Sequence, residues 1–509
     1  MLVLLALFFL WPIAPSSAVG QLHNGSSGGA FYIGYAGPYA ASPASAFGHL
    51  FLLHQPTDDT PLALWRAMTF RADVTHMNSA RSFLQGVSGG LSGSFAVTEF
   101  HELTLDYELI EDRDLWLFRL RLDRAEYSAM KHHFRESDGS RHRYSFFTSN
   151  CASQLLELIR GSLTELRSGG AFVSPLDVVQ RLAEKERIES AYVRSAATRI
   201  LRFQVRELPS RIRNHVANRE WTELASDTEW IESVQPDHLW FLSRYFRYRQ
   251  IDHRHPLGEE VAAGLGGLRI RLAENETPTL PSAPHLSPGA PTSFPTWHPR
   301  TEVSPYLRFH DNRSHRLGIR LRPALHEEHE SWVGHRPFNS MVLLTTEIET
   351  AADELDPTLS EFTVFSQRSL VPQDWLVDKA SWSFDARLAR GGPYGARELH
   401  AEVGVGIGLT RRWHGVAVSI LPTATVWNGL DDLTSLHGGV QFHVNRRTDH
   451  FMVYGFSGSY GHAMIGPGGG FGGGRAWVGA RLHPRVAILG ALAQRQDDTS
   501  TTLSVRLYP

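Results

Sequence analysis

Cysteine is the side chain best suited to covalent chemistry, and this chain of 509 residues contains a single one, Cys151. An aromatic, strand-like run, Arg143–Thr148, and the polar pair Ser149-Asn150 precede it. Apolar residues follow with helical spacing, at positions 155, 156, 158 and 159. Ser149 or Asn150 is expected to cap a helix whose first turn contains Cys151.

The start of a helix favours negative charge, because its first amides have no partner within the helix and the helix dipole is positive there. This position predicts a lowered thiol pKa and a reactive thiolate. The Asn150 side chain or the backbone amides at this turn could also stabilise an oxyanion during acyl transfer. The alternative is an inert thiol packed in a core.

The segment that indicates the compartment is the apolar stretch at residues 2–11, which is followed by the small residues Ser16 and Ala18. The apolar run and the small residues that follow it, outside the run, predict a signal peptide over residues 1–18. A single cysteine in an exported chain excludes an internal disulfide framework, which strengthens the case for a nucleophile.

The remaining chain divides by pattern into four regions. Residues 19–170 mix strands and helices, including an expected strand at 50–53, strands or mixed elements at 62–70, 97–109 and 115–122, and a helix at 123–136. Helical spacing predominates at 171–276, with Ser174 and Pro175 opening one helix and others expected at 186–207, 211–226 and 237–249. Residues 277–300 are rich in proline and read as a linker.

Apolar residues recur at every second position over residues 301–509. Leu317, Ile319 and Leu321 alternate with arginines, and similar alternation recurs near 382–388, 440–445 and 503–508. About 12 such segments of 8–12 residues are typical of an antiparallel outer-membrane β-barrel. A soluble β-sandwich is the alternative, although its strands are usually shorter. The predicted fold class is therefore α+β, with a helical middle block and a C-terminal barrel.

Charge and composition exclude several classes of function. The formal net charge is −3, so nothing favours nucleic acid as a partner. No pair of cysteines and no His-Glu-x-x-His sequence indicates a metal. No cofactor is expected.

Three short sequences, Phe47-Gly48-His49, Arg113-Asp114-Leu115-Trp116 and Tyr144–Cys151, occur in an order that resembles the Lnb N-terminal periplasmic domain family. The resemblance covers roughly residues 35–165. It implies a permuted papain-like core, related to NlpC enzymes, with Cys151 as nucleophile and His49 as base. Name-giving members are lipoprotein transacylases with transmembrane helices after this domain. Here no apolar run of about 20 residues follows.

The residue that would orient His49 is not identified by the sequence. Asp73 and His54 are candidates, and strand alternation places His54 on the opposite side from His49. The catalytic set predicted from sequence and resemblance is Cys151, His49 and Asn150.

Three functions remain open from the sequence. The first is a cell-envelope acyltransferase or hydrolase that forms a Cys151 thioester from a lipid or lipoprotein acyl group. The second is an NlpC-like peptidoglycan peptidase or amidase. The third is a non-catalytic barrel with a structural periplasmic domain. All three place the protein in the periplasm and outer membrane of a Gram-negative bacterium.

Overall fold

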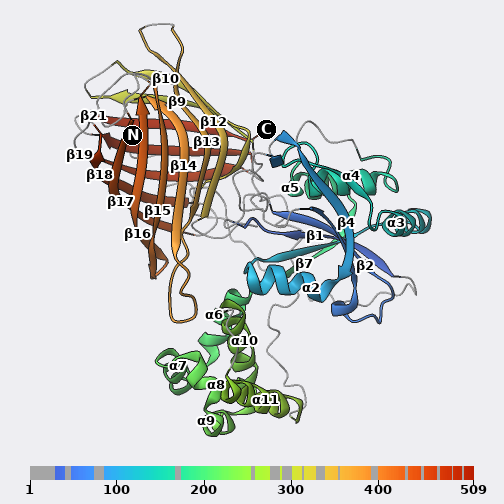
Figure 1. The fold of residues 1–509 in the computed structure, drawn as a ribbon. Helices are drawn as coiled ribbons and strands as arrows, with labels where there is room; N and C mark the ends of the chain where they lie inside the picture. The colour runs from blue at the N-terminus through green and yellow to red at the C-terminus, as the bar shows by residue number, and fades with distance from the viewer. Residues whose placement is uncertain are drawn as a thin grey trace, which may run out of the picture.

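The computed structural model describes residues 29–39, 48–73, 85–86, 88–166, 173–253, 258–274, 287–288, 301–311, 314–327, 339–353, 356–390, 399–429, 434–448, 452–466, 470–483, 485–495 and 498–508. The predicted signal peptide, Phe47 and all of the predicted linker except Ser287–Pro288 lie outside these residues. Figure 1 shows an N-terminal domain built on a sheet, a helical bundle and a barrel.

The N-terminal domain is built on an antiparallel sheet of eight strands in the order β6-β4-β3-β2-β1-β5-β7-β8. Their bounds are β1 (Ala30–Ala36), β2 (His49–Gln55), β3 (Arg66–Ala72), β4 (Leu91–Glu99), β5 (Leu115–Leu120), β6 (Arg141–Tyr144), β7 (Ile188–Arg194) and β8 (Ser287–Pro288). The central strands β1 and β2 are buried along almost their whole length.

Helices cover both faces of this sheet. Along β2, Leu50 and Leu52 join a core formed with α3 (Arg124–Glu136), α4 (Cys151–Arg160) and α5 (Pro175–Glu184). Phe51 and Leu53 point to the other face, where they pack against α2 (Phe100–Thr104) and the π-helical turn η3 (Leu105–Ile110). A short 3-10 turn, η2 (Leu62–Leu64), precedes β3.

Two expected elements of this region differ in the structure. The segment at 97–109, predicted as a strand or a mixed element, is a strand only to Glu99 and continues as α2 and η3, because Phe100, Leu103 and Tyr107 have helical spacing and pack onto the sheet. The helix predicted at 186–207 is divided into β7 and α6 (Ala197–Glu207). Pairing of β7 with β5 outweighs the local helical pattern there.

The helical bundle follows β7 and encloses its own core, which includes Trp221, Leu239, Phe241 and Phe246. Besides α6 it contains α7 (Ser210–Ala217), α8 (Trp221–Ser226), α9 (Thr228–Ser233), α10 (Pro236–His253) and α11 (Glu259–Glu274). Among the described residues, no helix is both long and apolar enough to cross a bilayer.

The barrel consists of β9 (Glu302–His310), β10 (Arg316–Arg322), β12 (Asn339–Ala351), β13 (Thr358–Ser369), β14 (Ser381–Arg390), β15 (Leu399–Trp413), β16 (Val416–Gly429), β17 (Thr434–Thr448), β18 (Met452–Ile465), β19 (Gly470–His483), β20 (Val486–Arg495) and β21 (Asp498–Leu507). These twelve antiparallel strands close because β10 pairs with both β9 and β12. The short strand β11 (Ala324–His326) extends the pairing of β12. The predicted barrel of about 12 strands is confirmed.

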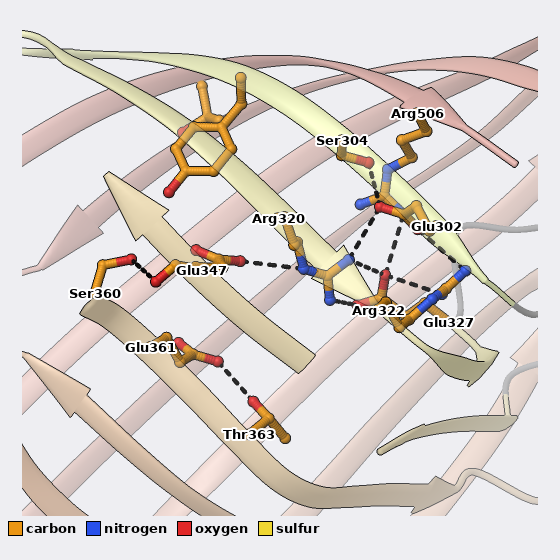
Figure 2. A network of polar contacts seen from close by, with 12 residues as sticks. Glu302, Ser304, Arg320, Arg322, Glu327, Glu347, Ser360, Glu361, Thr363 and Arg506 are labelled. Carbon is orange, nitrogen blue, oxygen red and sulfur yellow. Dashed lines mark hydrogen bonds and ion pairs between the residues drawn. The ribbon is translucent and has the colours of Figure 1, made fainter. Parts of the chain in front are cut away.

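The barrel has an apolar outside and a polar inside. Leu317, Ile319 and Leu321 of β10 are 46%, 39% and 39% exposed, and Leu503, Val505 and Leu507 of β21 follow the same pattern. The intervening Arg320 and Arg322 point inward to Glu302 and Glu327, and Arg506 joins them from β21 (Figure 2). A soluble barrel has the opposite arrangement, so this surface is built for lipid.

The connection between β13 and β14 holds the helical bundle at one end of the barrel. Leu376 and Val377 of this connection are buried in the core of the bundle. Arg202 of α6 pairs with Asp374 at 3.0 Å, and Arg249 of α10 pairs with Asp378 at 3.3 Å. The strand β9 enters the barrel at this same end and β21 finishes there, since the number of strands is even.

Candidate functional site

Cys151 is the first residue of α4, as the sequence predicts, and Asn150 is the capping residue. The Asn150 side-chain oxygen accepts from the amides of Ala152 and Ser153 at 2.9 and 3.0 Å. Its nitrogen donates to the carbonyls of Phe146 and Val173 at 3.0 and 2.9 Å. Both amide hydrogens are thus used within the domain. Asn150 is therefore the cap of α4, and the predicted role as oxyanion donor would require one of these two hydrogen bonds to break.

The Cys151 thiol lies in the core between α4 and the sheet, where only 5% of the residue is exposed. Burial raises its pKa to about 11, although amides of Leu50, Ala152 and Cys151 itself hydrogen-bond to the sulfur and Arg113 lies near it. The predicted lowering of the thiol pKa is wrong, because loss of water outweighs the helix terminus and the nearby charge. The resting form is a neutral thiol.

His49 begins β2, one residue before the amide that donates to the Cys151 sulfur. Its partner in the sheet is Ala36, and its ring centroid lies 5.9 Å from that of Tyr107, on the face opposite α4. Within the described part of the chain, Nε2 of His49 is buried without a hydrogen-bond partner. The structure thus brings the Cys151 sulfur to the backbone amide of Leu50, which follows His49. No hydrogen bond joins the side chains of Cys151 and His49.

The pKa of His49 is held well below its ordinary value, first by burial and then by the positive charges of Arg71 and Arg113. An imidazole in this environment is neutral at pH 7. A neutral ring can accept a proton, which is what a general base for a thiol requires.

Arg113, Arg71 and Tyr107 complete the surroundings of His49, and sequence reasoning assigned none of them a role. Arg113 is 1% exposed, donates to the Ala36 carbonyl at 2.9 Å and to that of Gly37, and pairs with Glu111. Its guanidinium lies 4.9 Å from the centroid of the Tyr107 ring. The sequence Arg113-Asp114-Leu115-Trp116, one of the three on which the family resemblance rests, was the signal that could have identified Arg113 as part of the site.

The two candidates for orienting His49 lie elsewhere. His54 points to the other face of β2, where it stacks on Phe31 and bonds to the Tyr127 hydroxyl at 3.0 Å. Asp73 accepts from the hydroxyls of Ser92 and Ser94. In the parts of the chain that the structure describes, no cluster of side chains could hold a metal ion.

Comparisons with known proteins give separate matches for the N-terminal domain and for the barrel. Residues 298–466 match a family described only as a domain of unknown function. No curated protein matches the chain significantly. The barrel is similar in fold to the KdgM porin, at 7% identity and a TM-score of 0.26, over 40% of this chain and 98% of that one. The anion-selective porin from Comamonas acidovorans is 8% identical, with a TM-score of 0.22, over 41% of this chain and 97% of that one.

Both TM-scores are low, and the evidence for the barrel is its own strand pairing and apolar outer surface. The match of the N-terminal domain does not depend on these porins. With an apolar barrel surface and a domain of a periplasmic family on one chain, the protein lies in the outer membrane with its N-terminal domain in the periplasm. Residues 31–185 match the Lnb N-terminal periplasmic domain, which confirms the resemblance inferred from the sequence.

Proposed function

We propose that this protein is a cysteine acyltransferase or hydrolase, anchored by its barrel in the outer membrane, that acts on a lipid or lipoprotein acyl group. The observation that carries the proposal is the position of the thiol. The single cysteine of the chain lies at the capped start of α4, against the amide of Leu50, and the next residue back along β2 is the neutral His49.

The proposed reaction begins with transfer of the thiol proton to His49 as the sulfur attacks an ester carbonyl. A bond forms between Sγ and the acyl carbon, and the ester C–O bond breaks. The leaving alcohol takes the proton from His49, and a thioester remains on Cys151. An amine or water then attacks the thioester carbon while His49 takes its proton. The bond between Sγ and carbon breaks, and the proton passes to the sulfur, so that the acyl group leaves as an amide or as a free acid and the thiol is restored.

Two amides are suited to stabilise the oxyanion in this reaction. The N–H groups of Leu50 and Cys151 both hydrogen-bond to the sulfur, so they converge where the acyl carbon must bond. The imidazole must also turn from Tyr107 toward the sulfur. Because Nε2 has no hydrogen-bond partner within the described residues, such a turn breaks no side-chain hydrogen bond of that atom.

The non-catalytic alternative has its own support. The thiol is buried with a raised pKa, and the imidazole rests on the other face of the sheet. Both features are also expected of an inert domain that only connects the barrel to the periplasm. A peptidoglycan peptidase or amidase would use the same cysteine and histidine, so only the substrate distinguishes it.

Intact mass spectrometry after incubation with envelope lipids tests these functions. The full-length protein in detergent should gain a fatty acyl mass that hydroxylamine removes. Cys151→Ala should gain none, and His49→Ala should acylate at least about a hundredfold more slowly. His54→Gln is the matched control, because His54 lies on the same strand but faces away, and it should acylate at the rate of the wild type.

An absent adduct together with a thiol that iodoacetamide does not modify in the folded state even at pH 10, where the thiol begins to ionise, would establish the non-catalytic alternative. A thiol that is alkylated but never acylated would reject the lipid substrate. Purified sacculi would then replace lipids in the same comparison of wild type with Cys151→Ala.

A further inference from the structure

A cavity of about 1130 Å³ lies where the three parts of the molecule meet. Its walls come from Tyr39 after β1, from η3, from α10 and α11, and from Lys379 in the connection between β13 and β14. This volume is sufficient for a ligand larger than most small metabolites.

The helices present matching faces to this cavity. On α10, the residues at 243, 247, 250 and 251 lie on one side of the helix, and on α11 those at 265, 268 and 269 do the same. The helices therefore contribute both apolar residues, such as the buried Leu265, and the exposed arginines Arg247 and Arg269.

The lining is amphipathic, and its charge has one sign. Arg247, Arg269 and Lys379 are cationic, and no carboxylate is among the described residues that line the cavity. Neighbouring carboxylates are already paired, Asp378 with Arg249 and Glu108 with Arg194. Neither Arg247 nor Arg269 has an ion-pair partner among the residues that the structure describes. The facing wall carries Leu109 and Ile110.

The location relates the cavity both to the membrane and to the candidate site. Lys379 lies two residues before Ser381, the first residue of β14, at the end of the barrel where the bundle docks. That end faces the periplasm, so the cavity is near the inner surface of the outer membrane. On the other side, η3 contributes Leu109 to the cavity and Tyr107 to the surroundings of His49.

We propose that this cavity binds an anionic phospholipid from the inner leaflet, with its phosphate at Arg247, Arg269 and Lys379 and its glycerol and upper acyl groups against the apolar wall. Guanidinium groups bind phosphate with two hydrogen bonds each, and the half-apolar lining fits an amphiphile better than a free anion. This inference rests on the proposed function and makes such a lipid the acyl donor.

Lipid binding to the full-length protein in neutral detergent is the test, with phosphatidylglycerol and phosphatidylcholine compared by native mass spectrometry. The wild type should prefer phosphatidylglycerol by about tenfold or more. Arg247→Ala/Arg269→Ala should lose that preference and leave phosphatidylcholine binding unchanged. Arg211→Ala/Arg213→Ala on α7 removes the same charge away from the cavity and should keep the preference.

Three results would overturn the proposal. These are equal binding of the two lipids, an equal loss in both double variants, and full displacement of the lipid by inorganic phosphate at millimolar concentration. The same titration with Cys151→Ala separates this site from the chemistry, because no thioester can form there. Preference retained in Cys151→Ala supports the site by itself. Acylation of the wild type with no preference would overturn the site alone.

Discussion

The barrel interior and the surroundings of Cys151 both bury polar groups, and they stabilise them in opposite ways. Glu302 is fully buried, yet Arg320, Arg322 and Arg506 lie 3.1–3.3 Å from its carboxylate. Cys151 is also buried, but it lies among apolar side chains, and Nε2 of nearby His49 has no hydrogen-bond partner within the described residues.

The difference separates a structural cluster from one available for chemistry. A buried charge held by several partners is fixed, and any change leaves the others uncompensated. A thiol and an imidazole that lack such partners remain free to react. Groups of this kind, with pKa values moved in opposite directions, are common in active sites, although burial alone produces the same shifts.

Replacement of Glu302 by alanine should have the largest effect on stability. Three guanidinium groups would lose the carboxylate between them at a site where Glu302 is fully buried. The barrel should lose about 3–5 kcal/mol of unfolding free energy. Urea unfolding in detergent, followed by circular dichroism, measures this loss.

The exposed carboxylate of Glu136 provides the control for Glu302. It pairs with His132 while 63% exposed, so Glu136→Ala should change stability by less than about 0.5 kcal/mol. A change below about 1 kcal/mol for Glu302→Ala would show that water enters the barrel and replaces the carboxylate.

Removal of the thiol should change how the stability of the N-terminal domain depends on pH. Burial raises the pKa of Cys151 from 9.0 to about 11, so the folded state holds its proton more tightly than the unfolded state. The stability due to the protonated thiol is present below pH 9 and is lost between pH 9 and 11. The loss is at most about 3 kcal/mol. Cys151→Ala should lack this loss in urea titrations at each pH.

The same pKa predicts slow alkylation of Cys151. At pH 7 about one thiol in ten thousand is ionised, and the iodoacetamide rate should rise about tenfold per pH unit up to pH 10. A rate that levels off near pH 9 would mean that the thiol is exposed in solution.

His49 makes the stability of the domain depend on pH in the acid range. Because its pKa is lowered in the folded state, the unfolded state binds the proton first, and stability falls as pH drops below 6.5.

Loss of the Asn150 side chain should destabilise α4 by about 2 kcal/mol, because the first-turn amides and the carbonyls of Phe146 and Val173 would lose their partner. Hydrogen exchange of the α4 amides, read by mass spectrometry, should accelerate accordingly. Ser174→Ala, which removes the cap of α5, is the matched variant and should affect α5 alone. Unchanged exchange at α4 would show that packing, and not the cap, fixes Cys151.

The parts predicted well from sequence are those in which one local pattern determines the structure. The alternation of apolar and polar residues predicted which face of β10 and β21 contacts lipid. The Ser149-Asn150 pair predicted the start of α4 to within one residue. The strand β7 was missed because its pairing with β5 is determined by residues about 70 positions earlier in the chain.

The sequence named candidate site residues, whose roles stay predictions, and it did not indicate their geometry. The sequence signals which residues carry chemistry, but the thiol pKa depends on how completely the sheet and α4 exclude water from Cys151. The orientation of His49 depends on Tyr107, which lies in a segment predicted as a strand or a mixed element and folded as η3. Both are properties of tertiary packing.

The smallest expected effect concerns the docking of the bundle on the barrel. The pair of Arg202 and Asp374 is 35% and 40% exposed, so a double-mutant cycle with alanine at both positions should give a coupling of about 0.5 kcal/mol. Leu376→Ala should weaken docking more, by about 2 kcal/mol, because Leu376 is only 2% exposed in the bundle core. Limited proteolysis of the β13–β14 connection ranks the variants. If Arg202→Ala proved the more susceptible, charge and not apolar burial would hold the bundle, as it holds the barrel interior.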